Sequence, residues 1–236
     1  MKVILLHGMG GGPADWNDVR SLFPAEAWSL PTKPTLEEVA EELAHRLSQE
    51  TAPYGLAGYS LGGRLAILLT HRLLNTPHRP CKLALLSAGL GFPTEEEKRA
   101  RIFQNRAWST LAEQNPEEFW RRWYAQGLFS TFAELPSATQ ERWLHARRSL
   151  EPAHLSRQLE DWSPSRHPYL KPLLLEIQRQ GISTLYLAGE RDKKYQSLAG
   201  ELSAEGLNTV ILPNAGHLLP LEAPAAVASA FAGFFV

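Results

Sequence analysis

The stretch Gly58-Tyr59-Ser60-Leu61-Gly62-Gly63-Arg64 decides the fold of this chain, because it joins a short apolar run to an amphipathic one. Residues 54–57 before it are predicted to form a buried strand, and the leucine-rich residues after it a helix. A serine on such a tight turn presents its hydroxyl at the carboxyl edge of a sheet, and the flanking glycines allow close backbone approach. The backbone N–H of Leu61 begins the helix, where it can stabilise negative charge.

The length and charge of the chain exclude several classes of protein. Its 236 residues suffice for one α/β domain with an insertion, but not for two comfortable domains. A formal net charge of -1 argues against a nucleic-acid-binding protein or a polybasic membrane anchor. No apolar run approaches the length of a membrane span, and the first residues are too short for a signal-peptide core. We therefore expect a cytoplasmic protein without nucleic-acid or membrane partners.

Short apolar runs alternate with amphipathic helices along most of the chain, which is typical of a parallel sheet covered on both faces. Thr35-Leu36-Glu37-Glu38 is a capping box that opens a helix ending near Leu47. Pro224 opens a last helix, since proline is tolerated in a first turn. Besides residues 54–57, four segments are predicted to be strands: 3–6, 83–87, 184–188 and 209–212. Cys81, the single cysteine, is expected just before one of them.

The strand pattern stops between residues 92 and 170. This segment is helical in pattern and rich in tryptophan and arginine, but its basic residues are matched by acidic ones. We therefore predict an α/β fold with a mostly parallel sheet, built from residues 1–91 and 171–236, into which residues 92–170 are inserted as a helical cap. A basic pocket in this region would depend on the placement of individual arginines.

A catalytic serine needs a histidine to take its proton, and the histidine needs an acid to fix its tautomer. In a sheet protein with this serine turn the chain order is serine, acid, histidine, which removes Asp15 and Asp18. Asp161 lies in the predicted cap, whereas Asp192 follows a predicted strand. We predict that Asp192 is the acid, with Glu190 as the alternative.

His217 is the one histidine among eight that follows a strand downstream of this acid, so it is predicted to be the base for Ser60. The glycine-rich loop that begins at His7 follows the first strand, and the N–H of Met9 is predicted as the second oxyanion donor beside Leu61. Such a loop can also cradle phosphates, but the spacings of nucleotide-binding motifs are absent. No Cys/His cluster has metal-ligand spacing, so neither a metal nor another cofactor is expected.

Together these motifs resemble the α/β-hydrolase superfamily, which implies its fold with an inserted helical cap. Within it the chain is similar to the 2-succinyl-6-hydroxy-2,4-cyclohexadiene-1-carboxylate synthases, pyruvate-eliminating lyases of menaquinone biosynthesis. The closer similarity covers nearly the whole chain, the predicted cap included. It rests on the following stretches: 58–64, 95–101 with 105–108, 119–124 with 128–129, and 189–195.

The resemblance implies a small polycarboxylate substrate held by arginines near the serine. By position it assigns this role to Arg64, Arg101 and Arg148, and it assigns aromatic pocket positions to Tyr59 and Trp123. A planar guanidinium makes paired hydrogen bonds to a carboxylate, which a lysine cannot reproduce. A pocket with several arginines favours the lyase over a simple esterase, whose pocket is mostly apolar.

The chemistry that the resemblance implies is proton abstraction. Ser60, activated by His217, removes a proton from the substrate ring, and pyruvate leaves without an acyl-enzyme while the oxyanion donors stabilise the enolate. The same triad also serves a carboxylester or thioester hydrolase, so this alternative stays open. The presence of all three triad residues argues against a non-catalytic binding module, because such a protein has no physical need for them. The sequence differs from the pattern of this family at two places. Residues 28–35 take a shorter route without glycine or histidine, and Leu219-Pro220 stands where relatives often carry another histidine. Both places are expected at the pocket mouth.

Overall fold

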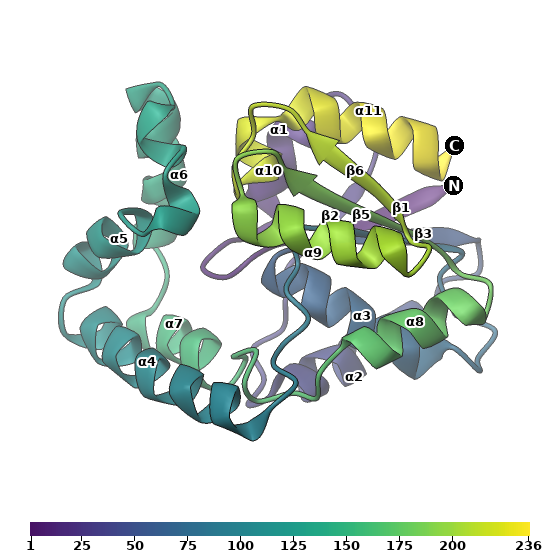
Figure 1. Ribbon diagram of the computed structural model, residues 1–236, viewed down its shortest axis with the longest axis horizontal. Coiled ribbons are helices and arrows are strands. Elements are labelled where there is room, and N and C mark those ends of the chain that lie inside the picture. The colour runs from purple at the N-terminus through teal and green to yellow at the C-terminus, as the bar shows by residue number, and fades with distance from the viewer.

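The computed structural model describes residues 1–236, and its centre is a six-stranded sheet in which every neighbouring pair of strands is parallel (Figure 1). The strand order is β2-β1-β3-β4-β5-β6. The strands are β1 (Lys2–Leu6), β2 (Glu26–Trp28), β3 (Tyr54–Tyr59), β4 (Lys82–Leu86), β5 (Ser183–Gly189) and β6 (Asn208–Leu212). Five of them lie at the predicted segments, and exposed Cys81 directly precedes β4. The three-residue edge strand β2 is too short to give an apolar pattern, and it was not predicted.

Helices cover both faces of this sheet, as predicted, so the α/β fold class is confirmed. One face packs against α2 (Leu36–Leu47), α3 (Leu61–Leu73), α8 (Lys171–Arg179) and α9 (Lys193–Ala204). The other face packs against α1 (Asn17–Arg20) and α11 (Pro224–Phe235). Successive strand residues supply the two cores alternately, because side chains in a strand point to opposite faces. None of the helices is both long enough and apolar enough to cross a membrane.

Local sequence signals fix where the helices begin. The predicted capping box is present at α2, where Glu38 N–H and Thr35 Oγ1 lie 3.2 Å apart and the Glu38 side chain returns to the Thr35 N–H. Leu36, Leu43 and Leu47 line the buried side of α2. Burying each such side chain contributes roughly 1.5–3 kcal/mol. Pro224 stands at the first turn of α11, as expected.

Between β4 and α8 the chain forms no strand. It contains the helices α4 (Glu95–Gln114), α5 (Pro116–Tyr124), α6 (Ser137–Arg148) and α7 (Pro152–Glu160), together with 3-10 turns at Gly127–Phe129 and Phe132–Glu134. Figure 1 shows α4, α5 and α6 to one side of the sheet and its helices. We call residues 92–170 the cap, and we propose the division into this cap and a core of residues 1–91 and 171–236.

Aromatic rings hold the cap together. We call Trp108, Phe119, Trp120, Trp123 and Tyr124 the aromatic cluster. The Phe119 ring lies 4.8 Å from the ring of Trp120 and 5.4 Å from that of Trp123, measured between centroids. Trp123 in turn meets Trp108 edge to face at 5.3 Å. Such pairs contribute roughly 0.5–1.5 kcal/mol beyond their buried area, so the cluster gives the cap a rigid inner wall.

Polar contacts attach the cap to the core at several points. Arg147 of α6 forms a two-pronged ion pair with Asp15 of the 3-10 turn Pro13–Trp16, at 3.2 and 2.9 Å, and both side chains are buried. The Gln158 side chain of α7 accepts a hydrogen bond from the Gly10 N–H at 2.7 Å. Removing one partner of a buried ion pair costs roughly 3–5 kcal/mol, so the Arg147–Asp15 pair is a strong point of attachment.

Candidate active site

Ser60 stands at the turn between β3 and α3 with φ 52° and ψ −110°, a backbone conformation that residues other than glycine rarely adopt. Its N–H donates to the Leu86 carbonyl oxygen at 2.8 Å, which ties the turn to the neighbouring strand. A Cβ at Gly58 would collide with the Gly62 carbonyl, and one at Gly62 would collide with the Leu6 carbonyl. The glycines on both sides of the serine are therefore needed for close backbone contacts that keep the strained turn in place.

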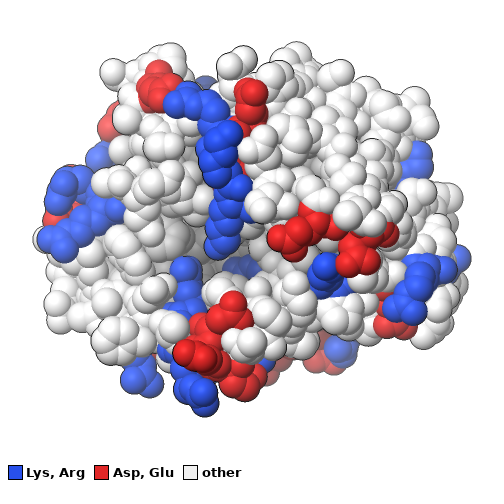
Figure 2. Space-filling model, viewed as in Figure 1, with Lys and Arg blue, Asp and Glu red and all other residues white.

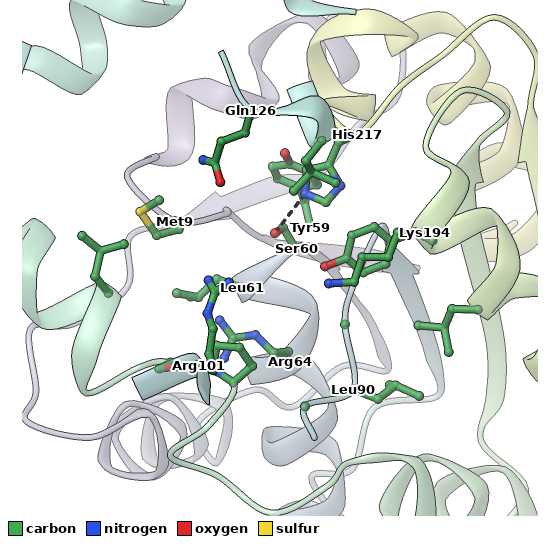
Figure 3. A pocket seen from close by; sticks show the side chains of 18 of the residues that line it. Met9, Tyr59, Ser60, Leu61, Arg64, Leu90, Arg101, Gln126, Lys194 and His217 are labelled. Atoms are coloured by element: carbon green, nitrogen blue, oxygen red, sulfur yellow. Dashed lines mark hydrogen bonds between the residues drawn. The ribbon is translucent and has the colours of Figure 1, made fainter. Parts of the chain in front are cut away.

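Ser60, His217 and Asp192 form a continuous hydrogen-bonded chain at the carboxyl edge of the sheet. Figure 3 shows the contact between Ser60 and His217. His217 Nε2 lies 3.3 Å from Ser60 Oγ, and His217 Nδ1 lies 2.7 Å from Asp192 Oδ2. Because an ionised carboxylate can only accept, Nδ1 carries the proton and Nε2 is free to take one from the serine. The alternative acid, Glu190, instead accepts from the Asn214 N–H at 2.9 Å. The structure therefore brings Asp192 to His217 and not Glu190.

A glutamate that sequence reasoning missed holds the loop that carries His217. Glu222, at the end of α10 (Leu219–Glu222), accepts from the Leu218 N–H at 2.9 Å and from the Gly216 N–H at 2.5 Å. These two residues flank His217, so one carboxylate fixes the backbone on both of its sides. The only sequence signal is an acidic residue five positions after the histidine.

The two predicted oxyanion donors line the same cavity as Ser60. Leu61 is the first residue of α3, and a first-turn N–H has no partner within its own helix. The N–H of Met9 donates no hydrogen bond within the chain. At the start of the same loop, His7 is buried, and burial lowers the pKa of its imidazole. Both backbone donors are therefore available to an oxygen that develops negative charge near Ser60.

The cavity beside Ser60 has a volume of about 430 Å³ and lies between the core and the cap. Tyr59 and Trp123, the two aromatic residues assigned to a pocket, both line it. The Tyr59 ring lies 5.6 Å from the His217 ring, and burial raises the pKa of its hydroxyl well above the usual value. Tyr59 is therefore a neutral wall of the cavity at physiological pH.

Arg64 is buried and reaches this cavity from α3. Its Nη1 donates to the Trp162 carbonyl oxygen at 2.8 Å and lies 3.0 Å from His167 Nε2. Burial lowers the pKa of Arg64 to about 10, so the guanidinium stays charged near neutrality. Burial, together with the charge of Arg64, lowers the pKa of His167 to about 3. His167 is therefore a neutral acceptor for the arginine.

Arg101 lines the cavity, whereas Arg148 does not, which corrects the expectation for Arg148. The Nε of Arg101 is buried without a hydrogen-bond partner, and burial lowers the pKa of its guanidinium. Arg148 instead lies on the surface and pairs with Glu141 at 2.8 Å. Neighbouring positions on a helix point about 100° apart, so only one of the adjacent arginines of α6 can face the core. That residue is Arg147, which lines the cavity but is bound by Asp15.

Two other features of the cavity differ from the sequence-based expectations. Lys194, on the first turn of α9, lines the cavity and was not predicted there. The departures at residues 28–35 and at Leu219-Pro220 do not line it, although the neighbouring Leu218 does. Residues 28–35 instead support the cap from outside, since the Trp162 indole N–H donates to the Lys33 carbonyl oxygen at 3.0 Å.

Comparisons with known proteins agree with this architecture. A family model described as "Alpha/beta hydrolase family" matches residues 3–230. The 2-succinyl-6-hydroxy-2,4-cyclohexadiene-1-carboxylate synthase of Pectobacterium atrosepticum is 32% identical over 96% of this chain and 90% of its own length. The protein of the same name from Yersinia pseudotuberculosis is 30% identical over 98% of this chain and 86% of its own length. Among solved structures, MenH from S. aureus has a TM-score of 0.91 at 23% identity, covering 100% of this chain and 93% of that one, which shows a shared fold.

Proposed function

The chain belongs to the alpha/beta hydrolase family, and on this premise we propose that it is a lyase that eliminates pyruvate from 2-succinyl-5-enolpyruvyl-6-hydroxy-3-cyclohexene-1-carboxylate in menaquinone biosynthesis. The names of its relatives at 30–32% identity support the proposal. The observation that carries it is the charge of the cavity. Arg64 and Arg101 line the space beside Ser60, and neither forms an ion pair with a carboxylate of the chain.

In the proposed reaction, His217 takes the proton of Ser60 Oγ as the serine oxygen removes a proton from the substrate ring. The electron pair left on the ring is delocalised as an enolate, whose oxygen the N–H groups of Met9 and Leu61 stabilise. The enolate then collapses, a ring double bond forms, and the bond from ring carbon to enolpyruvyl oxygen breaks. The departing enolate takes up the proton held by His217 and becomes pyruvate. Ser60 keeps the proton taken from the ring, so both residues are back in their starting states.

Asp192 keeps His217 in the tautomer that this step requires, because its carboxylate accepts the Nδ1 proton. Arg64 and Arg101 orient the substrate through its carboxylates, so that the ring proton faces Ser60. Tyr59 and Trp123 exclude water from the reacting atoms. No covalent bond to Ser60 is needed, which separates this reaction from ester hydrolysis.

The test is pyruvate release by the purified protein, followed with a coupled dehydrogenase, beside cleavage of p-nitrophenyl esters. We expect pyruvate release to be far faster than ester cleavage. Efficient ester cleavage without pyruvate release would replace the lyase by the carboxylester hydrolase alternative.

Ser60→Ala and His217→Ala should each reduce pyruvate release by at least about 10³-fold, because members of a triad act as a unit. Their circular dichroism spectra should match that of the parent. A variant that keeps activity within about tenfold of the parent would remove that residue from the mechanism.

A further inference from the structure

The cavity is lined by four cationic side chains, but they are not equally available to a ligand. Arg147 is already neutralised by Asp15. Arg64, Arg101 and Lys194 form no ion pair within the chain. Figure 2 shows Lys and Arg side chains bordering a hollow near the middle of one face of the molecule. The cavity therefore presents three positive charges that no carboxylate of the chain neutralises.

Lys194 lies next to the catalytic groups. It is the second residue after Asp192, on the first turn of α9, and its Nζ lies 5.3 Å from the centre of the Tyr195 ring. That ring lies 4.9 Å from the His217 ring. Figure 3 shows the ammonium group of Lys194 pointing into the cavity beside Ser60, across from Arg64 and Arg101.

The acidic residues of the cavity leave Lys194 free. Glu97 and Glu201 also line it, and both are exposed. Glu97 is occupied at the start of α4, where its carboxylate accepts from Thr94 Oγ1 at 2.6 Å. Glu201 lies about two turns along α9 from Lys194, and no ion pair joins them. A ligand carboxylate is therefore the partner that the ammonium lacks.

We propose that Lys194 binds one carboxylate of the substrate and, with Arg64 and Arg101, sets the preference of the site for a tricarboxylate. This inference rests on the proposed function, because the proposed substrate carries three carboxylates to match the three free cations. An ammonium is a strongly hydrated point charge on a flexible stem. Since Lys194 is exposed, salt should screen its contribution, whereas buried Arg64 should be screened less.

The neighbouring lysine provides a matched control. Lys193 is on the same turn of α9, but its Nζ donates to the Glu190 carbonyl oxygen at 3.0 Å and it does not line the cavity. Lys194→Gln and Lys193→Gln therefore make the same change of charge at adjacent positions. Only the first should alter the cavity.

At low ionic strength, Lys194→Gln should raise KM for pyruvate release about three- to tenfold with kcat within about twofold of the parent. Lys193→Gln should match the parent, and Lys194→Arg should recover most of the loss. The difference between the two Gln variants should shrink at about 0.5 M salt. Equal KM values for the two Gln variants, or an equal loss of pyruvate release and ester cleavage in Lys194→Gln, would overturn the proposal.

Calorimetric titration with propane-1,2,3-tricarboxylate separates this proposal from the lyase proposal. The parent and Lys193→Gln should bind it more tightly than Lys194→Gln does, whatever reaction the enzyme catalyses. Such binding without pyruvate release would contradict the proposed lyase activity and support the role of Lys194 in binding a carboxylate. Pyruvate release with binding unaffected by Lys194→Gln would support the lyase and overturn the role of Lys194. Failure of the parent to bind the tricarboxylate would also overturn that role.

Discussion

Some N–H groups of Arg64 donate to the protein, and the others remain available to a ligand in the cavity. It lies one helical turn after Ser60, so both side chains start from the same side of α3. Its Nη1 is used by the Trp162 carbonyl oxygen and by His167, and the remaining N–H groups donate no hydrogen bond within the chain. The contacts with the protein fix the plane of the guanidinium before a ligand arrives, which lowers the entropic cost of binding a carboxylate.

Arg64→Ala should raise KM for the proposed tricarboxylate substrate on the order of ten- to a hundredfold, which corresponds to the roughly 1.5–3 kcal/mol of a charge-assisted hydrogen bond. Cleavage of a neutral ester should stay nearly unchanged. Arg64→Lys should recover only part of the loss, because an ammonium lacks the planar fork. Steady-state kinetics of the three proteins on both substrates measure this. An equal loss of both activities, or a melted protein, would make Arg64 a structural residue.

Single residues of the candidate site were predictable where chain order constrained them. Asp192 and His217 each follow a strand of a parallel sheet, and all such strand ends meet at one edge, so they had to lie near Ser60. Arg148 was misplaced because the sequence does not give the rotation of α6 about its axis. Lys194 and Glu222 carry no motif, and their roles follow from contacts between segments.

At the scale of elements, the length of a strand determined whether it could be predicted from the sequence. The five strands of five to seven residues show apolar runs, whereas β2 has three residues at the edge of the sheet. The capping box of α2 was predictable because its hydrogen bonds are local. The loop between β6 and α10 was not, since it has no regular pattern. There the orientation of His217 depends on the two backbone contacts of Glu222.

Glu222→Gln should lower pyruvate release about tenfold and the free energy of unfolding by about 1–2 kcal/mol. An amide keeps one acceptor oxygen, so one of the N–H groups of Gly216 and Leu218 loses its partner. Glu141→Gln, which removes only the surface pair with Arg148, should change stability by less than about 0.5 kcal/mol and leave activity intact. Urea unfolding and kinetics of both variants check this. Parent-like activity in Glu222→Gln would show that the loop does not need the carboxylate.

At the scale of the whole molecule, buried groups attach the C-terminal end of the cap to the core. His167 lies in this segment, where it accepts from Arg64 and its Nδ1 lies 2.8 Å from the Pro168 carbonyl oxygen. Its pKa falls to about 3 in the folded protein, mainly through burial, from 6.5 for a free histidine. Between these two values the unfolded chain binds a proton that the folded chain does not. The contribution of His167 to the free energy of unfolding is therefore fully present above about pH 6.5, and it is lost as the pH falls below that value.

His167→Gln should weaken this pH dependence, because glutamine does not titrate and its Oε1 can accept from Arg64. Between pH 7 and pH 5 the parent should lose about 2 kcal/mol more of its free energy of unfolding than the variant does. His7 and His154, whose pKa values are also lowered by burial, are present in both proteins and cancel in the comparison. Urea unfolding at the two pH values measures the difference. Parallel losses in the two proteins would show that His167 is not kept neutral by the fold.

The aromatic cluster also determines which part of the molecule an optical measurement sees. Of the seven tryptophans, five belong to the cap: Trp108, Trp120, Trp123, Trp143 and Trp162. Because Trp123 both contacts Trp108 and lines the cavity, an anion entering the cavity perturbs a coupled pair of indoles. Intrinsic fluorescence should therefore report ligand entry and the packing of the cap, while far-ultraviolet circular dichroism follows the backbone of the whole fold. Together the two signals distinguish loosening of the cap from unfolding of the sheet without any added label.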